Sequence, residues 1–260
     1  IGQPVVIANI GGASGTVGAR EARNSPPDGY TLFAVHDYIH LTYYAGMADV
    51  SYKDFEPICR IAATPSVLTA SAKTPWKTFK EFVEDAKKRP GEITVGATLG
   101  STSHLFPATI EKAAGIKLKY VSYDGLAPRM NAILGGHVDL TDSNLTQKGK
   151  VEAGELKFLA VATEERLPEI PDVPTLKENG LDIVYEVVRG LLVPKGTPAD
   201  VRAKLDEACA KATAEPEYAE ALRLQGTRVA YLNAKDYGAF LDKLDADNKA
   251  IMTELGLAKK

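Results

Sequence analysis

The sequence lacks any apolar run long enough to cross a membrane. No stretch of even about 18 consecutive apolar residues occurs, whereas a membrane-spanning helix needs about 20. We therefore expect a chain that is not embedded in a membrane. No signal peptide is visible either. The sequence opens at Ile1 rather than at an initiator methionine, so this second absence says little about secretion.

A strong excess of charge of either sign is also missing. The 260 residues include 31 Lys and Arg against 34 Asp and Glu, a formal net charge of −3. A basic surface is the usual electrostatic signature of nucleic-acid binding. The near-balance therefore gives no reason to expect nucleic acid or a membrane surface as a partner. The 45% hydrophobic content is ample for a sizeable core, in one large domain or two smaller ones.

Cysteine is scarce, and the histidines form no convincing metal site. The two cysteines are Cys59 and Cys209, and no Cys/His spacing matches a zinc site. Free cysteines are usually buried, so two buried thiols are favoured; a disulfide in an oxidising compartment is the alternative. His36 and His40 are four residues apart but lack a Glu between them and a third ligand. No metal and no cofactor are expected.

Short apolar runs alternate with helical patterns along the whole chain. This alternation predicts βαβ units and a mostly parallel sheet, that is, an α/β fold. The expected strands are residues 5–8, 31–35, 58–63, 67–70, 93–96, 118–121, 138–141 and 158–162. The expected helices are residues 14–23, 76–88, 103–114, 128–134, 146–153, 175–179, 199–214, 217–224 and 235–255.

Two features predict two lobes with a central cleft. Pro90-Gly91 precedes a fresh βα series, and the apolar run that ends at Pro194 is followed by a tail that we expect to be all helical. The run is interpreted as the return of the chain to the first lobe. The predicted first lobe is residues 1–92 and 190–260, and the second is residues 93–189. A single α/β domain is the alternative.

Two loops rich in glycine and hydroxyl side chains lie between a predicted strand and a predicted helix, at residues 9–16 and 98–104. In α/β sheets, ligands bind at the carboxyl ends of strands, where free N–H groups at a helix N-terminus hold an anion. A carboxylate fits such a site without an arginine. Ordinary N-capping by Ser14 and Ser103 is the alternative. Neither loop has dinucleotide-binding spacing or the lysine of a P-loop.

The signals for catalysis are weak. No G-x-S-x-G nucleophile elbow occurs, and Asp124, Asp139 and Asp142 show no pairing that singles out an acid and a base. His104 follows the second loop, where it could donate to a ligand or cap a helix. Arg189 is unusual in its apolar run. We favour a structural ion pair for Arg189 over a bond to a ligand carboxylate.

Several segments, in this order, resemble the solute receptors of tripartite tricarboxylate transporters, the Bug or TctC-like family. Their order and spacing are more specific than any one of them, and together they cover nearly the whole chain. The segments are residues 4–7, 11–15, 27–32, 100–105, 120–125, 135–139, 159–162, 174–175, 178–180 and 190–198.

The resemblance implies a two-lobed periplasmic-binding-protein fold (type II-like) and a periplasmic receptor that hands its solute to an integral membrane permease. Family ligands are mostly di- and tricarboxylates, with aromatic carboxylates among the others, held by loop amides, hydroxyls and bridging waters. A monomer is expected. Carried over by position, the ligand-binding residues are Gly12, Ala13, Ser14, Asp37 and Tyr38 in the first lobe, and Gly100, Ser101, Thr102, Ser103, His104, Tyr123, Asp142 and Ser143 in the second.

The chain departs from the family pattern in two places. The family normally begins with a strand, a glycine-rich loop and a helix ahead of the segment that matches Ile1-Gly2-Gln3-Pro4, and the first lobe here lacks that unit. If the molecule begins at Ile1, we expect an unpaired strand position and impaired binding. In addition, His36-Asp37-Tyr38 replaces a small hydroxyl-rich stretch, which favours a bulkier or aromatic wall beside the ligand.

Two other functions share the predicted fold. One is a sensory module that presents its ligand to a membrane kinase rather than to a permease. The other is an α/β hydrolase that uses a serine or histidine. The weak catalytic signals disfavour the hydrolase, whereas the sequence does not separate a sensor from a transport receptor.

Overall fold

The computed structural model describes residues 2–260 and contains two compact units. Unit 1 is Ile1–Ala63 with Val188–Lys260, and unit 2 is Thr64–Val187. The chain passes from one unit to the other within two long strands, β2 (Phe55–Pro65) and β8 (Glu186–Pro194). The α/β class is confirmed, and each unit has its own sheet. Residues 64–92, which we expected in the first lobe, fall in unit 2.

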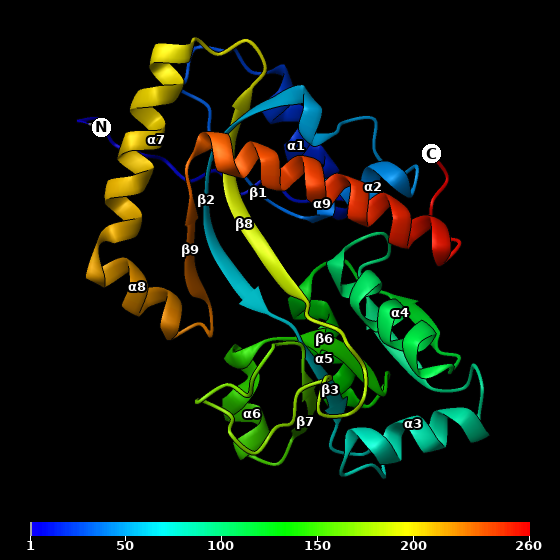
Figure 1. The fold of residues 1–260 in the computed structure, drawn as a ribbon. Helices are drawn as coiled ribbons and strands as arrows, with labels where there is room; N and C mark the ends of the chain where they lie inside the picture. The colour runs from blue at the N-terminus through cyan, green and yellow to red at the C-terminus, as the bar shows by residue number, and fades with distance from the viewer. Residues whose placement is uncertain (1) are drawn as a thin grey trace. The chain divides into compact units, whose positions relative to one another are not determined.

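Unit 1 is built on a four-stranded sheet in the order β1-β8-β2-β9. β1 (Phe33–His36) pairs antiparallel with β8, and β9 (Arg228–Leu232) pairs antiparallel with β2. Buried side chains from strands and helices, including Phe33, Ile39, Leu192 and Leu241, form one core. The helices, labelled in Figure 1, are α1 (Thr16–Asn24), α2 (Tyr38–Tyr44), α7 (Ala199–Ala214), α8 (Pro216–Arg223) and α9 (Ala234–Glu254).

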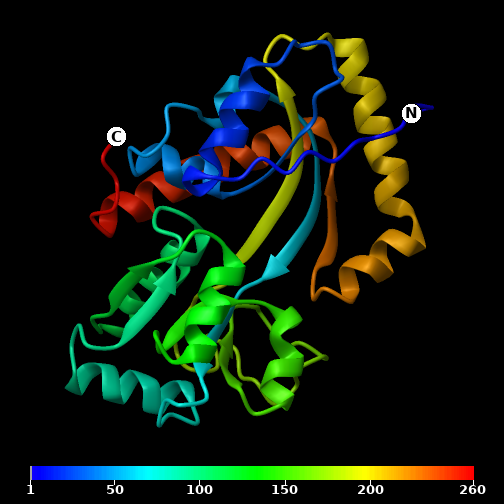
Figure 2. The ribbon, with the colours of Figure 1, turned by 180° about the vertical axis from the view of Figure 1, so that it is seen from behind.

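The prediction of a mostly parallel sheet is wrong for unit 1, because the registered strand pairs there are antiparallel. The expected strand at residues 5–8 is also absent. Val5, Val6 and Ile7 are 63%, 86% and 76% exposed, and no strand in the described part of the chain pairs with them. Figure 2 shows this dark-blue segment as a plain coil. An apolar run forms a strand only where a neighbour satisfies its backbone, and sequence alone does not supply that neighbour.

Unit 2 is built on a five-stranded sheet in the order β5-β4-β6-β3-β7. β4 (Thr94–Ala97) is parallel to both β5 (Lys119–Ser122) and β6 (Leu140–Ser143), while β3 (Val67–Ser71) is antiparallel to β6 and to β7 (Leu156–Val161). Since β3 lies between β6 and β7, residues from 64 onward belong to this unit. The helices are α3 (Phe79–Lys88), α4 (Thr102–Ala114), α5 (Leu126–Gly135) and α6 (Lys148–Glu152). The helix expected at residues 175–179 is a turn instead.

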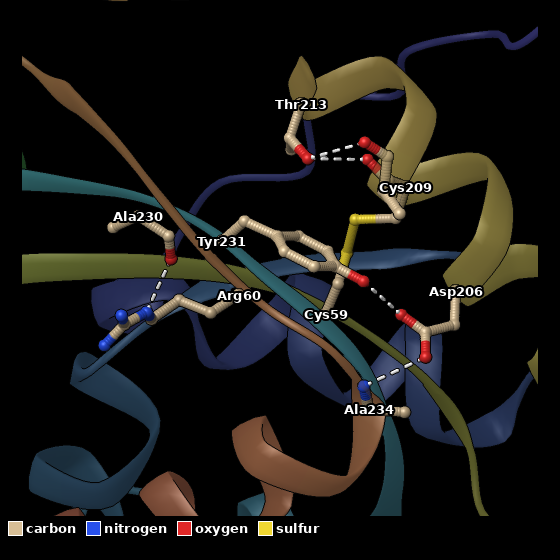
Figure 3. The surroundings of a disulfide bond; sticks show 9 residues. Cys59, Arg60, Asp206, Cys209, Thr213, Ala230, Tyr231 and Ala234 are labelled. Carbon is tan, nitrogen blue, oxygen red and sulfur yellow. Dashed lines mark hydrogen bonds between the residues drawn. A yellow bond between two sulfur atoms is a disulfide. The ribbon is translucent and has the colours of Figure 1, made fainter.

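The two cysteines form a disulfide in unit 1, so the prediction of two free thiols is wrong. Cys59 lies on β2 and Cys209 on α7, with Cα atoms 6.6 Å apart. Figure 3 shows the bond beside the hydroxyl end of the Tyr231 ring, and this hydroxyl donates to Asp206 Oδ1 at 3.0 Å. The other Asp206 oxygen accepts from the Ala234 N–H at 3.1 Å, at the start of α9. The disulfide therefore lies where α7, β9 and α9 are joined to β2.

None of the helices formed by residues 2–260 combines the length and apolar character that a membrane span requires.

Candidate ligand-binding site

The carboxyl ends of three parallel strands define one edge of the unit 2 sheet. β4, β5 and β6 end at Ala97, Ser122 and Ser143, and the predicted second-lobe residues lie at the end of β6, in the loops that follow β4 and β5, and in the first turn of α4. Thr98 joins two of these loops, because its hydroxyl donates to the Tyr123 carbonyl at 2.8 Å and accepts from the Gly125 N–H at 3.1 Å. Sequence reasoning did not single out Thr98, although it is the first residue after β4.

The loop before α4 is fixed by its own hydroxyl groups. Ser103 Oγ accepts from the Thr98 N–H at 3.0 Å, and Ser101 Oγ donates to the Thr98 carbonyl at 2.8 Å. The two serine hydroxyls lie 3.1 Å apart. Ser101 is the N-cap residue by position, yet neither its side chain nor that of Ser103 caps the helix. The capping alternative for Ser103 is therefore wrong: its hydroxyl shapes the loop.

The first turn of α4 keeps unpaired backbone donors. Within the described residues, no hydrogen bond is formed by the backbone N–H groups of Thr102 or Ser103. Free N–H groups at a helix N-terminus, added to the helix dipole, attract an anion. Thr102 and Ser103 are buried, so their surroundings strengthen such an interaction relative to water.

His104 and Gly100 are linked within this loop. The Gly100 N–H donates to His104 Nδ1 at 3.3 Å, and the ring packs edge-on against Tyr120 with centroids 4.6 Å apart. Burial lowers the pKa of His104, which favours the neutral ring. Because Nδ1 accepts a hydrogen bond, the neutral ring carries its proton on Nε2.

Three further predicted residues lie at the same edge. Tyr123 donates its N–H to the Ala97 carbonyl at 2.9 Å, which continues the sheet beyond β4. Ser143 has its hydroxyl 2.6 Å from that of Thr69 on β3, so this hydroxyl is engaged by the sheet. Asp142 is 6% exposed, and its Oδ1 has no partner in the described part of the protein. Burial raises the pKa of Asp142 to about 7.

Arg129 on α5 is a buried cation at this edge that sequence reasoning missed. Its Nε donates to the Gly125 carbonyl at 3.1 Å, while Nη1 donates to Thr141 Oγ1 at 3.2 Å and to the Asp142 carbonyl at 3.1 Å. Burial lowers the pKa of the guanidinium, and the Asp142 charge opposes that effect. The sequence signal was weak, since one arginine in an amphipathic helix is usually exposed.

The predicted first-lobe loop of unit 1 has an unusual backbone. Gly12, Ala13, Ser14 and Gly15 have φ values of 111°, 48°, 55° and 85° in succession. Ala13 and Ser14 pay a conformational cost in this region, and such strain concentrates at functional sites. Ser14 makes no capping hydrogen bond, so its capping alternative is wrong as well. At the start of α1, Thr16 Oγ1 is buried without a partner in the described chain.

Tyr38 holds this loop from α2. Its hydroxyl donates to the Gly15 carbonyl at 3.2 Å, and burial raises its pKa to about 12. A Cβ atom at Gly15 would lie 2.7 Å from the tyrosine ring, so only glycine fits this approach. The structure thus brings the predicted residue Tyr38 next to the predicted loop.

His36 and Asp37, the two residues before Tyr38, interact with β8. Asp37 Oδ2 accepts from the Val188 N–H at 3.3 Å, and burial raises the Asp37 pKa to about 7 although Arg189 opposes it. His36 is opposite Arg189 in the β1–β8 register, and burial and Arg189 lower its pKa to about 3. The charge of Arg189 thus acts on Asp37 and His36 within unit 1, which agrees with the structural role that we favoured for it.

Over residues 2–260, no group of three or more His, Cys, Asp or Glu side chains is placed to hold a metal ion. His40, one of the two closely spaced histidines, contacts Asp245 through Nδ1 at 3.1 Å instead. In the same described range, His104 makes no hydrogen bond to Ser101 or Ser103, so the site offers no serine–histidine pair.

Comparison with known proteins gives a match over nearly the whole chain. The family model described as the tripartite tricarboxylate transporter family receptor matches residues 1–257. A solved structure of the periplasmic binding protein BugD is 30% identical, covers 98% of this chain and 88% of its own, and has a TM-score of 0.89.

Two similar structures contain carboxylates. Rpa4515 of R. palustris, solved with adipate, is 30% identical with a TM-score of 0.91, over 99% of this chain and 88% of its own. MatC of Rhodopseudomonas palustris, solved with bound malate, is 27% identical with a TM-score of 0.85, over 96% of this chain and 88% of its own. The resemblance seen in the sequence and the α/β periplasmic-binding-protein fold are thereby confirmed.

Proposed function

The chain belongs to the tripartite tricarboxylate transporter receptor family, and from that premise we propose that it captures a small carboxylate outside the cytoplasm and delivers it to the transporter's membrane permease. It is a solute-binding receptor by family, and two similar receptors were solved with adipate and malate. For this chain itself, we propose four properties: a carboxylate ligand, a permease partner, a periplasmic location and a monomeric state.

The first turn of α4 carries the proposal. The N–H groups of Thr102 and Ser103 lack acceptors within the described chain, and the loop before them is held rigid by Thr98, Ser101 and Ser103. Donors that are already fixed lose little entropy when a carboxylate arrives. The proposed second-unit contacts are these two amides, the loop hydroxyls and His104.

Unit 1 contributes a second set of donors. The N–H groups of Gly12, Ala13 and Ser14 also make no hydrogen bond among the described residues, and the strained loop aligns them. Successive N–H groups in such a turn form an anion-binding concavity. We propose this loop, considered within unit 1 alone, as an anion-binding loop that suits a carboxylate group.

A receptor without catalysis is proposed, since neither serine of the α4 loop is paired with His104 in the described residues. A receptor that signals to a membrane kinase would use the same site. Binding to purified permease subunits supports transport, whereas ligand-dependent binding to a kinase ectodomain alone contradicts it.

A thermal-shift screen of mono-, di-, tri- and aromatic carboxylates tests capture. A ligand that binds only the folded state at 100 times its Kd adds about 2.7 kcal/mol to the free energy of unfolding. We expect at least one acid to raise the melting temperature. If none does, the proposal fails.

The role of α4 is tested by Thr102→Pro. Thr102 is the first residue of α4, where proline is tolerated, and the substitution removes its N–H group together with its hydroxyl. Ser101 before it has an extended backbone, which suits a following proline. Loss of a hydrogen bond to a charged group costs about 1.5–3 kcal/mol, so we expect affinity to fall about tenfold or more.

Ala199→Pro is the matched control for this variant. Ala199 is the exposed first residue of α7, and it follows Pro198, which also has an extended backbone. The control is expected to bind as the unaltered chain does. Equal affinities of the two proline variants contradict the assignment of the carboxylate to α4.

A further inference from the structure

Two buried side chains of unit 2 each have a polar atom without a partner. Asp142 Oδ1 and Ser66 Oγ make no hydrogen bond in the described part of the chain. Asp142 is 6% exposed and Ser66 is 1% exposed. Burying a polar atom without a hydrogen bond is unfavourable, and more so for a charged group. Two such atoms close together therefore need an explanation.

Both side chains point to the face of the sheet that α4 covers. Successive strand residues alternate between faces, and directly paired residues share one. Leu140 packs in the same core as Phe106 of α4, so Asp142, two residues later, lies on that face. Leu68 is paired with Asp142 and belongs to the same core. Ser66 precedes Leu68 by two residues, and its hydroxyl acts on the Asp142 carboxyl group.

The pair lies at the edge of the sheet where α4 begins. Asp142 is one residue from the end of β6, and Ser66 directly precedes β3, which runs antiparallel to β6. The backbone of Ser66 is fully used, since its N–H donates to the Tyr185 carbonyl and its carbonyl accepts from the Ala162 N–H. Only the side chains of Asp142 and Ser66 can still form further hydrogen bonds.

The charged neighbour of Asp142 does not supply the missing hydrogen bond. Burial raises the pKa of Asp142 to about 7, while Arg129 and the Ser66 hydroxyl oppose the shift. Arg129 is the charged neighbour, yet its guanidinium donates to the Asp142 backbone carbonyl, to the Gly125 carbonyl and to the Thr141 hydroxyl. Apart from the nearby Ser66 hydroxyl, no described side chain is placed to donate to the Asp142 oxygen that lacks a hydrogen bond.

We propose that Asp142, with Ser66, accepts a hydrogen bond from a hydroxyl or ammonium group of the ligand, so that the site selects hydroxy- or amino-substituted carboxylates over plain ones. This inference rests on the proposed function, because it names the ligand class of the same site. A plain acid leaves Asp142 Oδ1 buried without a donor from the ligand. A substituted acid supplies the missing donor.

Calorimetric titration of acid pairs that differ by one substituent tests the selection. The pairs are malate with succinate, aspartate with succinate, and 2-hydroxyadipate with adipate, at pH 8 where Asp142 is largely ionised. In at least one pair we expect the substituted acid to bind about tenfold or more tightly, because a site built to bond a hydroxyl rejects the analogue without it. At pH 6 the affinity of the plain acid is expected to rise toward that of its partner.

The outcomes distinguish a failure of the proposed function from a failure of the proposed ligand preference. If no carboxylate binds, the proposed function fails together with this inference. If plain acids bind at least as tightly as their substituted partners in every pair, capture stands and the inference is overturned. This comparison uses the unaltered chain, so it does not depend on a variant that folds.

Two variants test whether Asp142 and Ser66 cause the preference for substituted acids. Asp142→Asn keeps the size, removes the negative charge and adds an N–H donor, and it is expected to reduce the preference to less than about threefold. Ser66→Ala is expected to reduce it in the same direction. Asp182→Asn is the matched control, because the Asp182 side chain is 90% exposed in the same unit. A preference that persists in folded Asp142→Asn and Ser66→Ala proteins overturns the assignment.

Discussion

Ser103 shows why the sequence could predict which residues lie at this site but not which hydrogen bonds their side chains form. The loop composition predicted a cluster of hydroxyl and N–H donors, and Thr98, Ser101, Ser103 and His104 do lie together there. The sequence did not show that the Ser103 hydroxyl bonds to Thr98 rather than capping α4, because both roles need the same residue type near the same position. Contacts from distant segments decide between them.

Gly15 yields a prediction for the loop of unit 1. Gly15→Ala places a side chain at φ 85° and 2.7 Å from the buried Tyr38 ring. The left-handed conformation alone costs about 1–2 kcal/mol for an L-residue. We therefore expect the free energy of unfolding in urea to fall by more than about 1 kcal/mol and ligand affinity to fall as well.

Gly149→Ala is the control for this substitution. Gly149 lies in α6, and nothing lies within 4 Å of a Cβ built there. Alanine is favoured over glycine in helices by about 1 kcal/mol, so this variant should be as stable as the unaltered chain or more so. An equal loss of stability in both variants contradicts the contact described for Gly15.

Asp142 yields a prediction for the pH dependence of stability. Its pKa is raised by burial to about 7 in the folded state from an ordinary 3.8, so the folded chain binds this proton more tightly than the unfolded chain. The stabilisation is complete below pH 3.8 and is lost as the pH rises through 7. Urea unfolding at pH 5 and pH 8 should show that the unaltered chain loses stability relative to Asp142→Asn.

The difference between the two proteins isolates Asp142 from other groups. His36 and Asp37 have shifted pKa values in unit 1, but both proteins share them. Arg129, the charged neighbour of Asp142, stays protonated throughout this range. A difference that is the same at both pH values contradicts the burial of an ionisable carboxyl group.

Among the elements, the strongly periodic helices and several short strands, such as β3 and β4, could be predicted from sequence, whereas α2 and β9 could not. The amphipathic pattern near Phe79 and Phe82 located α3, and Asn233 is the N-cap of α9 as expected. α2 and β9 were missed. α2 is a short helix that packs against α9, and β9 exists because β2 pairs with it. Neither partner is visible in the local sequence.

The disulfide between β2 and α7 could not be predicted from the sequence either. Two cysteines 150 residues apart in the chain carry no information on the distance between them in the fold. Cys59→Ala with Cys209→Ala is expected to lower the free energy of unfolding by about 2–4 kcal/mol. Guanidinium chloride unfolding with and without reductant measures this loss. Reductant should destabilise the unaltered chain and leave the double variant unchanged.

A thiol assay under denaturing, non-reducing conditions gives an independent check on the disulfide. The bonded pair predicts no reactive thiol per chain. Two reactive thiols, together with a double variant of unchanged stability, would contradict the bond.

At the scale of the whole molecule, the α/β class and two units could be predicted, whereas the point at which the chain first changes unit could not. Pro90-Gly91 interrupts the sequence pattern, but the chain already leaves unit 1 after Ala63. The reason is that β2 continues past this point and β3 then enters the unit 2 sheet between β6 and β7. Strand order within a sheet depends on long-range pairing rather than on local breaks.

The central claim is that the chain binds a carboxylate reversibly and leaves it unchanged. The most direct test is isothermal titration calorimetry with the acid that most raises the melting temperature, followed by mass spectrometry of the recovered acid. The account predicts one acid bound per chain, recovered intact, with affinity reduced in Thr102→Pro and retained in Ala199→Pro. Absence of binding by every carboxylate, or conversion of the acid into a product, would contradict it.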